Sequence, residues 1–307
     1  MDLRQLRQFV TVADTLHFGR AAALLGMTQP PLSQSIQALE REVGAPLFDR
    51  TKRSVALTAF GSQWLDHVRP ALDGVAALPE IAGRLRTGAA GRIALSFVST
   101  ADYSVLPLLV QLYSTRFPDV EISLIEATSD VQIDALLNGR TDAGILIPTR
   151  PALPEGLDYR TLLVEPLVAA VPEAWIAEGR LGPVGPMLRG EGWMDQPLLI
   201  FPPRVSPDFH ALVLGYYRSR GREPLIRQEA IQMQTIISLV SAGMGMALVP
   251  RSLQHLARTG VRYLPLGKDA PVLETGLAWR SGDPSPTLAA FLKTVEEERP
   301  GESMARS

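Results

Sequence analysis

Apolar residues recur at helical spacing through the N-terminal part of the chain, in three successive segments. Over positions 3–16 they fall every three or four residues, which predicts an amphipathic helix. A short Ala-rich helix over 18–25 is predicted to end at Gly26, because glycine is favoured just past a helix end. A third helix follows, with apolar residues on one face from Leu32 to Val43.

The third segment also has a polar outer face. Thr28 is placed to cap it, and Pro30 and Pro31 fall in its first turn, where a missing N–H costs little. A helix, a short helix, a turn and a third helix form the helix-turn-helix layout, in which the third helix enters the major groove of DNA. Hydroxyl and amide side chains can bond base edges there. The outer face carries Ser33, Gln34, Gln37 and Arg41.

A candidate β-wing follows the third helix. Residues 47–48 and 55–57 are predicted as two short strands joined by a turn. Arg50, Lys52 and Arg53 cluster at that turn, where cations can bond phosphates or enter the minor groove. The alternative is a plain three-helix packing unit with a solvated polar surface. The cationic wing favours the DNA-binding interpretation.

Positions 64–85 carry apolar residues at alternating steps of four and three, the spacing of a coiled-coil seam. This pattern favours a dimerising linker helix over a single helix lying on its own core. Pro70 and Pro79 each remove a backbone donor, so the helix is expected to bend at these points or to end near Pro79. The small residues of 88–91 are interpreted as a hinge to the next domain.

Strand and helix patterns alternate beyond position 92, which implies a largely parallel sheet covered by helices. Ser129 with Gln132 is interpreted as a capping box, and the tail 299–307 is predicted to be disordered. The predicted strands are 93–97, 120–125, 142–147, 163–171, 198–201, 246–249, 261–266 and 273–279. The predicted helices are 99–117, 130–137, 208–220, 233–242 and 287–298.

Several motifs in the first 61 residues occur in the order and spacing that one known family shows. They are Ala21-Ala22, Gln29 through Ser33, the Ile36/Leu39/Glu40 spacing, Gly44 through Phe48, Arg50, Arg53, and Leu57 through Gly61. These residues closely resemble the N-terminal domain of LysR-type transcriptional regulators. Residues 92–307 resemble, more loosely, the two-lobed effector domain of the same family, which is itself similar to periplasmic solute-binding proteins.

The resemblance implies an architecture in three parts. They are an N-terminal all-α winged helix-turn-helix domain over 1–58, a linker helix for dimerisation over 59–88, and a C-terminal α/β two-lobed effector domain over 89–307, like periplasmic binding proteins. By analogy the chain crosses between lobes near Thr161 and near Leu266. Lobe one is then 92–161 with 267–300, and lobe two is 162–266.

The resemblance and the cationic wing together predict the DNA contacts. Many family members carry Arg where this chain has Gln34, and Gln prefers adenine edges while Arg prefers guanine edges. The base preference of those relatives therefore does not transfer to this chain. The predicted DNA-binding residues are Gln29, Pro30, Pro31, Ser33, Gln34, Gln37, Arg50, Lys52 and Arg53.

A small-molecule site is predicted where strands end and helices begin, the ligand edge of an open α/β sheet. Helix N-termini there favour an anion, and Phe201 with Pro202 gives an apolar wall, so a small organic carboxylate fits. The alternative is that the hydroxyls are ordinary helix caps. Arg204 could pair with a carboxylate or be solvated. The predicted effector-binding residues are Ser99, Thr100, Thr128, Ser129, Phe201, Pro202 and Gln232, with Gln234 as the alternative to Gln232.

Composition narrows the function classes. The chain has 307 residues and no cysteine, which excludes disulfides, thiolate catalysis and Cys-ligated metals. Four scattered His residues have no metal-ligand spacing, and no nucleotide-binding or nucleophile-elbow motif occurs, so no cofactor, metal or catalytic residue is predicted. No apolar run approaches a membrane span and no signal peptide pattern precedes the first helix, so we expect a cytoplasmic protein without membrane contact.

Two functional hypotheses follow. The first is a regulator, not an enzyme, that binds double-stranded DNA at an inverted-repeat operator as a homodimer or homotetramer and responds to a small anionic effector. The second is a stand-alone solute-binding or enzymatic α/β module whose N-terminal part only drives oligomerisation. The winged helix-turn-helix, the apolar seam and the two-lobed domain in one chain favour the first.

Overall fold

The computed structural model describes residues 1–51, 54–148, 153–182 and 185–298. The chain divides into two compact units, Met1–Gly83 and Arg84–Ser307, and each is described by itself below. We call the first the head and the second the effector unit. The predicted tail, 299–307, and the wing residues Lys52 and Arg53 lie outside the described residues.

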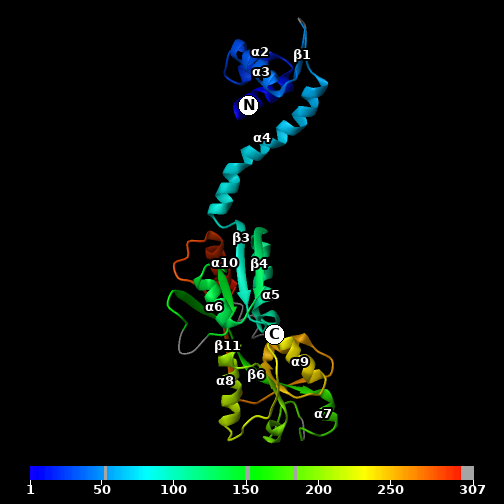
Figure 1. Ribbon diagram of the computed structural model, residues 1–307, viewed down its shortest axis with the longest axis vertical. Coiled ribbons are helices and arrows are strands. Elements are labelled where there is room, and N and C mark those ends of the chain that lie inside the picture. Colours follow the sequence, from blue (N-terminus) through cyan, green and yellow to red (C-terminus); the bar gives the residue numbers. More distant parts are fainter. Residues whose placement is uncertain (52–53, 149–152, 183–184, 299–307) are drawn as a thin grey trace. The chain divides into compact units, whose positions relative to one another are not determined.

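The head is a three-helix unit with a two-stranded wing (Figure 1). Its buried side chains come from all three helices, from Leu47 and Phe48 at the first wing strand and from Val68 of the long helix that follows, and Phe9, Leu32 and Ile36 are fully buried. Rings of Phe9 and Phe48 lie 5.5 Å apart, which joins the wing to the first helix. The elements are α1 (Leu3–Thr15), α2 (Phe18–Leu24), α3 (Gln29–Val43), β1 (Phe48–Arg50) and β2 (Val55–Leu57), which confirms the predicted helix-turn-helix and wing.

The linker is one long helix, α4 (Ala59–Arg86), with Pro70 and Pro79 inside it. Of the two expected alternatives, an end near Pro79 is wrong, because the helix continues to Arg86; both prolines lie on exposed positions of the helix. Its first turn is fixed by Thr58, whose hydroxyl accepts a hydrogen bond from Gly61 N at 2.8 Å and donates to Pro46 O at 2.7 Å. These bonds tie the start of α4 to the wing.

The effector unit is built on a mixed sheet, not the largely parallel sheet that the strand–helix alternation implied. In this sheet, as far as it is described, β3 pairs in parallel with β4 and β5. The pairs of β11 with β5 and β6, and of β6 with β9 and β10, are antiparallel, and β7 and β8 form a separate parallel pair. The strand order is β10-β6-β11-β5-β3-β4. The strands are β3 (Ala90–Phe97), β4 (Asp119–Glu126), β5 (Ala143–Leu146), β6 (Leu157–Pro172), β9 (Ala247–Pro250), β10 (Val261–Pro265) and β11 (Val272–Arg280).

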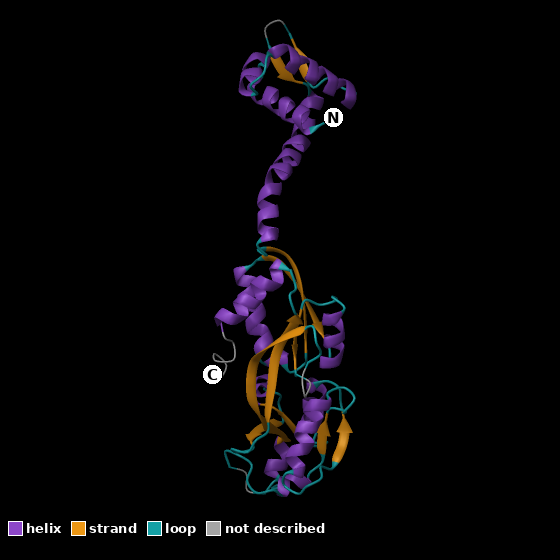
Figure 2. Cartoon of the chain, turned by 90° about the vertical axis from the view of Figure 1, so that its left-hand side faces the viewer, coloured by secondary structure: helices purple, strands orange, loops and turns teal. Residues whose placement is uncertain are grey.

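Two long strands connect the lobes, and they are the reason for the mixed sheet. Figure 2 shows β6 and β11 running side by side between the two lobes. The β6–β11 ladder shifts register at Thr275/Gly276. A Cβ on Gly276 would lie 2.2 Å from the Tyr159 ring, so only glycine allows this close approach. The predicted hinge 88–91 is partly strand, because β3 already begins at Ala90.

Helices cover both lobes. In lobe one, Tyr113 of α5 donates a hydrogen bond to Thr287 O and packs edge-on against Phe291 of α10. In lobe two, Trp193 packs against Tyr217 of α8. Lobe one holds α5 (Val105–Arg116), α6 (Ser129–Leu137) and α10 (Pro286–Glu298). Lobe two holds α7 (Glu173–Ala177), α8 (Pro207–Arg218), α9 (Met233–Ser241), β7 (Leu198–Ile200) and β8 (Ile226–Glu229), of which the sequence did not predict α7 and β8.

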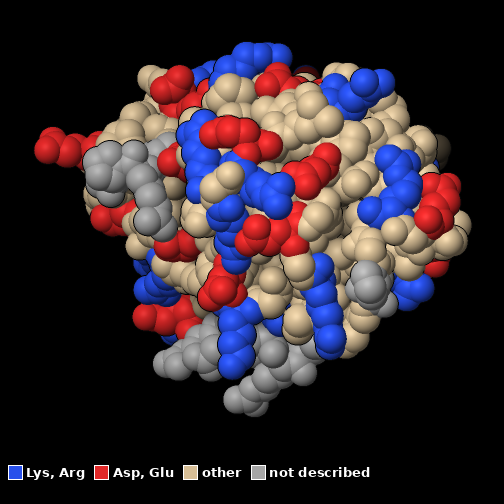
Figure 3. Space-filling view, turned by 90° about the horizontal axis from the view of Figure 1, so that it is seen from below, with Lys and Arg blue, Asp and Glu red and all other residues tan. Residues whose placement is uncertain are grey.

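Basic and acidic side chains are intermingled on the face that Figure 3 shows. Lobe two contains several such pairs, including Arg222 with Asp195 at 2.8 Å and Arg218 with Glu223 at 3.3 Å. Neighbouring charges of opposite sign cancel at a distance, so this face has no broad basic field for nucleic acid. Among the described residues, no helix is both long and apolar enough to cross a membrane.

Candidate functional site

The outer face of α3 is the first candidate surface. Gln34 and Gln37 are exposed, and within the described residues their side chains make no hydrogen bond. Thr28 occupies the N-cap position, but its side chain makes no capping bond. Gln29, Pro30 and Pro31 are exposed at the start of the helix and Ser33 is half-buried. The helix therefore presents amide side chains whose hydrogen-bonding capacity is available to base edges.

The opposite face of α3 fixes its position. Leu32, Ile36 and Leu39 are fully buried there. Ser35 donates a hydrogen bond of 2.5 Å to Gln8 Oε1, and Gln8 is the single buried polar residue in the described part of the head. The sequence reasoning missed this polar bridge between α1 and α3, because it joins positions 27 residues apart.

The wing is braced from α3 by an ion pair. Glu40 accepts hydrogen bonds from Leu47 N and Phe48 N at 2.9 and 3.2 Å, and from the Arg50 guanidinium at 2.6 Å. The same guanidinium lies 4.9 Å above the Phe18 ring. Arg50, predicted as a DNA contact, thus holds the base of the wing in this structure. The two other predicted wing cations, Lys52 and Arg53, lie outside the described residues.

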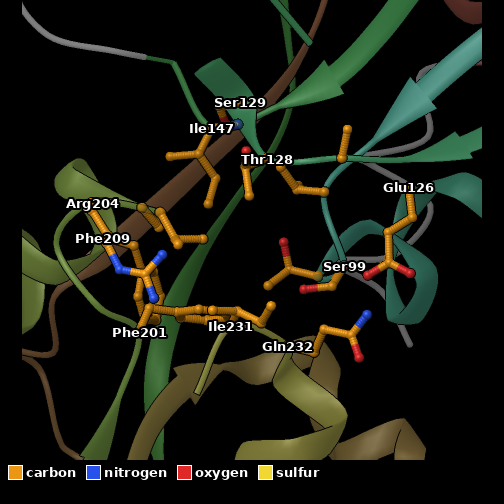
Figure 4. Close-up of a pocket in the computed structure, with 15 residues that line it drawn as sticks. Ser99, Glu126, Thr128, Ser129, Ile147, Phe201, Arg204, Phe209, Ile231 and Gln232 are labelled. Carbon is orange, nitrogen blue, oxygen red and sulfur yellow. Dashed lines mark hydrogen bonds between the residues drawn. The ribbon is translucent and has the colours of Figure 1, made fainter. Parts of the chain in front are cut away.

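The second candidate site is a cavity of about 310 Å³ between the lobes of the effector unit (Figure 4). That volume is at the lower end of the range for small-molecule pockets. The structure brings six of the seven predicted effector residues together on its wall: Ser99, Thr100, Thr128, Ser129, Phe201 and Gln232. The seventh, Pro202, is not among the residues that line it.

The start of α6 supplies two of the hydroxyls, but without the predicted capping box. Thr128 is the N-cap and Ser129 accepts a hydrogen bond from Ile147 N at 3.2 Å. Gln132 does not reach back to the cap. It is fully buried, donates to Ala127 O at 2.9 Å and accepts from Ser96 at 3.1 Å. The capping box does not form, because the Gln132 amide is hydrogen-bonded to Ala127 and Ser96 instead.

The other pair of hydroxyls does not open a long helix as predicted. Residues 101–103 form one 3-10 turn, and α5 begins only at Val105. Thr100 is 5% exposed, and its Oγ1 has no hydrogen-bond partner among the described residues. A buried hydroxyl without a partner is costly, so it marks a place where a ligand or a water would be stabilised.

An apolar wall and two charged residues complete the cavity. The rings of Phe201 and Phe209 meet edge-on, 5.5 Å between centroids. Glu126 and Arg204 also line the cavity, and the sequence reasoning raised only Arg204. The remaining apolar lining residues are Val98, Ala127, Ile147, Val205 and Ile231. They were missed because each lies in a segment that only the folded lobes bring to the site.

Asp102 follows the lining residues Ser99 and Thr100 in the chain and does not itself line the cavity, but its pKa is altered. Burial raises the pKa of Asp102 above its ordinary value, and the nearby charge of Glu126 raises that pKa further. The negative charge of Glu126 therefore acts on Asp102. In the described part of the chain, no group of three or more His, Cys, Asp or Glu residues could hold a metal ion.

Two family models match the chain. The model described as the LysR substrate binding domain matches residues 86–300, and that for the bacterial regulatory helix-turn-helix protein of the lysR family matches residues 3–62. Both models describe parts of regulators rather than an enzyme. The second match supports the helix-turn-helix interpretation over a plain packing unit.

Similar proteins span the whole chain. The HTH-type transcriptional regulator IlvR of Caulobacter vibrioides is 60% identical over 299 residues, covering 97% of this chain and 98% of that protein. AlsR of Bacillus subtilis is 37% identical over 292 residues, covering 95% and 94%. A crystal structure of full-length CbnR complexed with its target DNA aligns with a TM-score of 0.76 at 26% identity, covering 97% of this chain and 100% of that one.

Proposed function

The chain belongs to the LysR family of DNA-binding transcriptional regulators, and we propose that a small organic carboxylate bound between the lobes of its effector unit controls its action on DNA. The proposal rests on the groups that line the cavity. Hydroxyls at strand–helix junctions, the N-terminus of α6 and the Arg204 guanidinium converge there beside an apolar surface. Hydroxyls, helix N-termini and guanidinium groups all favour a carboxylate.

We propose that α3 lies in the major groove and reads bases through its exposed amides. The support is the availability of the Gln34 and Gln37 side chains and the burial of the opposite face of the helix. The wing then contacts the backbone or the minor groove, with Arg50 acting mainly to position it. The full proposed set is Gln29, Pro30, Pro31, Ser33, Gln34, Gln37, Arg50, Lys52 and Arg53.

We propose that the linker helix pairs two chains. Leu78 and Leu85, which belong to the predicted seam of α4, are 56% and 49% exposed. Two such seams cover each other in a coiled coil, so a homodimer or homotetramer on an inverted-repeat operator is the expected assembly.

Ligand binding would act through the strands that join the lobes. Residues of both lobes line the cavity, and β6 and β11 are the long strands that connect them. A carboxylate that contacts both lobes favours the state in which they lie closest. It changes DNA binding only to the extent that it binds this state more tightly than the other.

The test uses a buried hydroxyl and a matched control. Thr100→Val removes the buried hydroxyl of a residue that lines the site, and this Oγ1 has no partner in the described residues, so folding should be unaffected. Thr141→Val changes a second buried, unpartnered hydroxyl that does not line the cavity. A thermal-shift screen of small aromatic and aliphatic carboxylates on the full chain first identifies one that raises Tm.

We expect Thr100→Val to weaken that carboxylate at least tenfold while leaving affinity for operator DNA unchanged, about 1.4 kcal/mol of ligand binding. Thr141→Val should bind it normally. Equal binding by the two variants would contradict the proposed site. A screen in which no carboxylate raises Tm would contradict the proposed ligand class.

A further inference from the structure

The cavity carries opposite charges on its two sides. Figure 4 shows the Arg204 guanidinium pointing into the cavity beside Phe201 and Phe209. The Glu126 carboxylate lies on the opposite side, next to Ser99 and near Gln232. A ligand that reaches across the cavity therefore meets a cation at one end and an anion at the other.

Neither charge is neutralised inside the effector unit. Within its described residues, no ion pair involves Glu126 or Arg204, whereas Arg280 in the same unit contacts both Asp142 and Asp283. The ion-pairing capacity of the two cavity charges is therefore available to a ligand. Both side chains are exposed, so a ligand can reach them.

The backbone holds Glu126 in place. It is the last residue of β4, and the next residue, Ala127, donates a hydrogen bond of 3.0 Å to Phe97 O and accepts one from the buried Gln132 amide. The position of this acid is thus set by the core of lobe one rather than by a free loop. A backbone position that is already fixed does not have to be ordered when a ligand binds, which lowers the cost of binding at this residue.

The surroundings of Glu126 disfavour a second ligand carboxylate. Asp102 lies close enough for the charge of Glu126 to raise its pKa. A ligand carboxylate at this end would meet like charge, whereas an ammonium group would meet attraction. The Arg204 guanidinium suits a carboxylate at the other end.

We infer that the cavity selects a zwitterion, an amino acid with an apolar side chain, whose ammonium group faces Glu126 and whose carboxylate faces Arg204. The side chain then packs against Phe201, Phe209 and Ile147. This inference rests on the proposed function, which requires only the carboxylate. It adds Glu126 as the residue that decides between an amino acid and a plain or doubly charged acid.

Matched ligands test the inference on the full chain. The probes are L-leucine and L-phenylalanine, 4-methylpentanoate and 3-phenylpropanoate, which lack the amine, and 3-methylbutylamine and 2-phenylethylamine, which lack the carboxylate. Glu126→Gln removes the charge, and Glu121→Gln is its control, because Glu121 is exposed on the same strand but does not line this cavity. Isothermal calorimetry measures affinity.

We expect an amino acid to bind at least tenfold more tightly than its partner without the amine. Glu126→Gln should remove that difference, and Glu121→Gln should preserve it. If the acid without the amine binds as tightly as the amino acid, or if Glu126→Gln keeps the difference, the inference is wrong while the proposed carboxylate function stands. If none of these four carboxylates binds but the thermal-shift screen identifies another that does, the inference alone is wrong; if no carboxylate in the screen binds either, both fail.

Discussion

The outer face of α3 and the cavity of the effector unit are built on opposite plans. The α3 surface is one continuous segment whose apolar residues are buried in the head and whose amides are exposed. The cavity draws on five separate stretches, 98–100, 126–129, 147, 201–209 and 231–232. A substitution within the head can therefore alter the α3 surface by displacing that one helix. The second site depends on how β6 and β11 join the lobes.

The strongest test of this contrast is Gly61→Ala. A Cβ at Gly61 of α4 would lie 2.2 Å from the backbone oxygen of Leu47, the residue just before β1, so backbone must move. We expect the head to lose about 3 kcal/mol of stability, the upper end of the usual cost of overpacking, because the Cβ meets backbone and not a flexible side chain. Specific DNA binding should fall with it, while the effector unit keeps its affinity for ligand.

The same helix provides the control. A Cβ at Gly74 would have nothing within 4 Å, so Gly74→Ala should stabilise α4 by about 0.5–1 kcal/mol. Thermal unfolding, DNA binding by gel shift and ligand binding by calorimetry are measured for both variants. Loss of ligand binding in Gly61→Ala would show that the two units do not respond separately.

A smaller change should alter the reading of DNA without altering the fold. Gln34 is exposed and makes no hydrogen bond in the described head, so Gln34→Arg leaves the core untouched. We expect selection from a random duplex library to shift from adenine to guanine at one position of each half-site, by about 1–3 kcal/mol. Gln34→Ala is the control and should relax the preference at that position. An unchanged base preference in both variants would remove Gln34 from the reading surface.

The sequence predicted the head more completely than the cavity, and the contrast explains why. Helical periodicity and Gly44 at the end of α3 are local signals, and the structure confirms the three helices and the wing. Local signals also located the hydroxyls of Ser99, Thr100, Thr128 and Ser129 at the ligand edge of the sheet.

Features that arise from contacts between distant parts of the chain could not be predicted from the sequence. Glu126 looks like an ordinary solvated acid at a strand end until Arg204 is seen across the cavity. The amide of Gln132 fits a capping box by spacing, but the buried contacts with Ser96 and Ala127 decide its orientation. Likewise, alternating strands and helices do not reveal that β6 and β11 cross the lobes antiparallel to each other.

The smallest expected effect concerns a buried charge that only the effector unit contains. Glu165 of β6 is 4% exposed and accepts hydrogen bonds from Ser252 N at 2.6 Å and from Ser252 Oγ at 2.9 Å, whereas the described part of the head buries no charged residue. Burial raises the pKa of Glu165, while Ser252, Arg251 and His255 lower it in part.

Because the raised pKa means that the folded state holds a proton which the unfolded state has lost, stability should fall as pH rises from the ordinary glutamate value through the raised one. Glu165→Gln should remove this slope, since the amide does not titrate, and Ser252→Ala should extend it to higher pH by removing a donor to the carboxylate. Urea unfolding of the effector unit across that pH range measures both. If the pH dependence of stability persists in Glu165→Gln, another group causes it. If unfolding of the head shows the same pH dependence, the two regions do not differ in this respect.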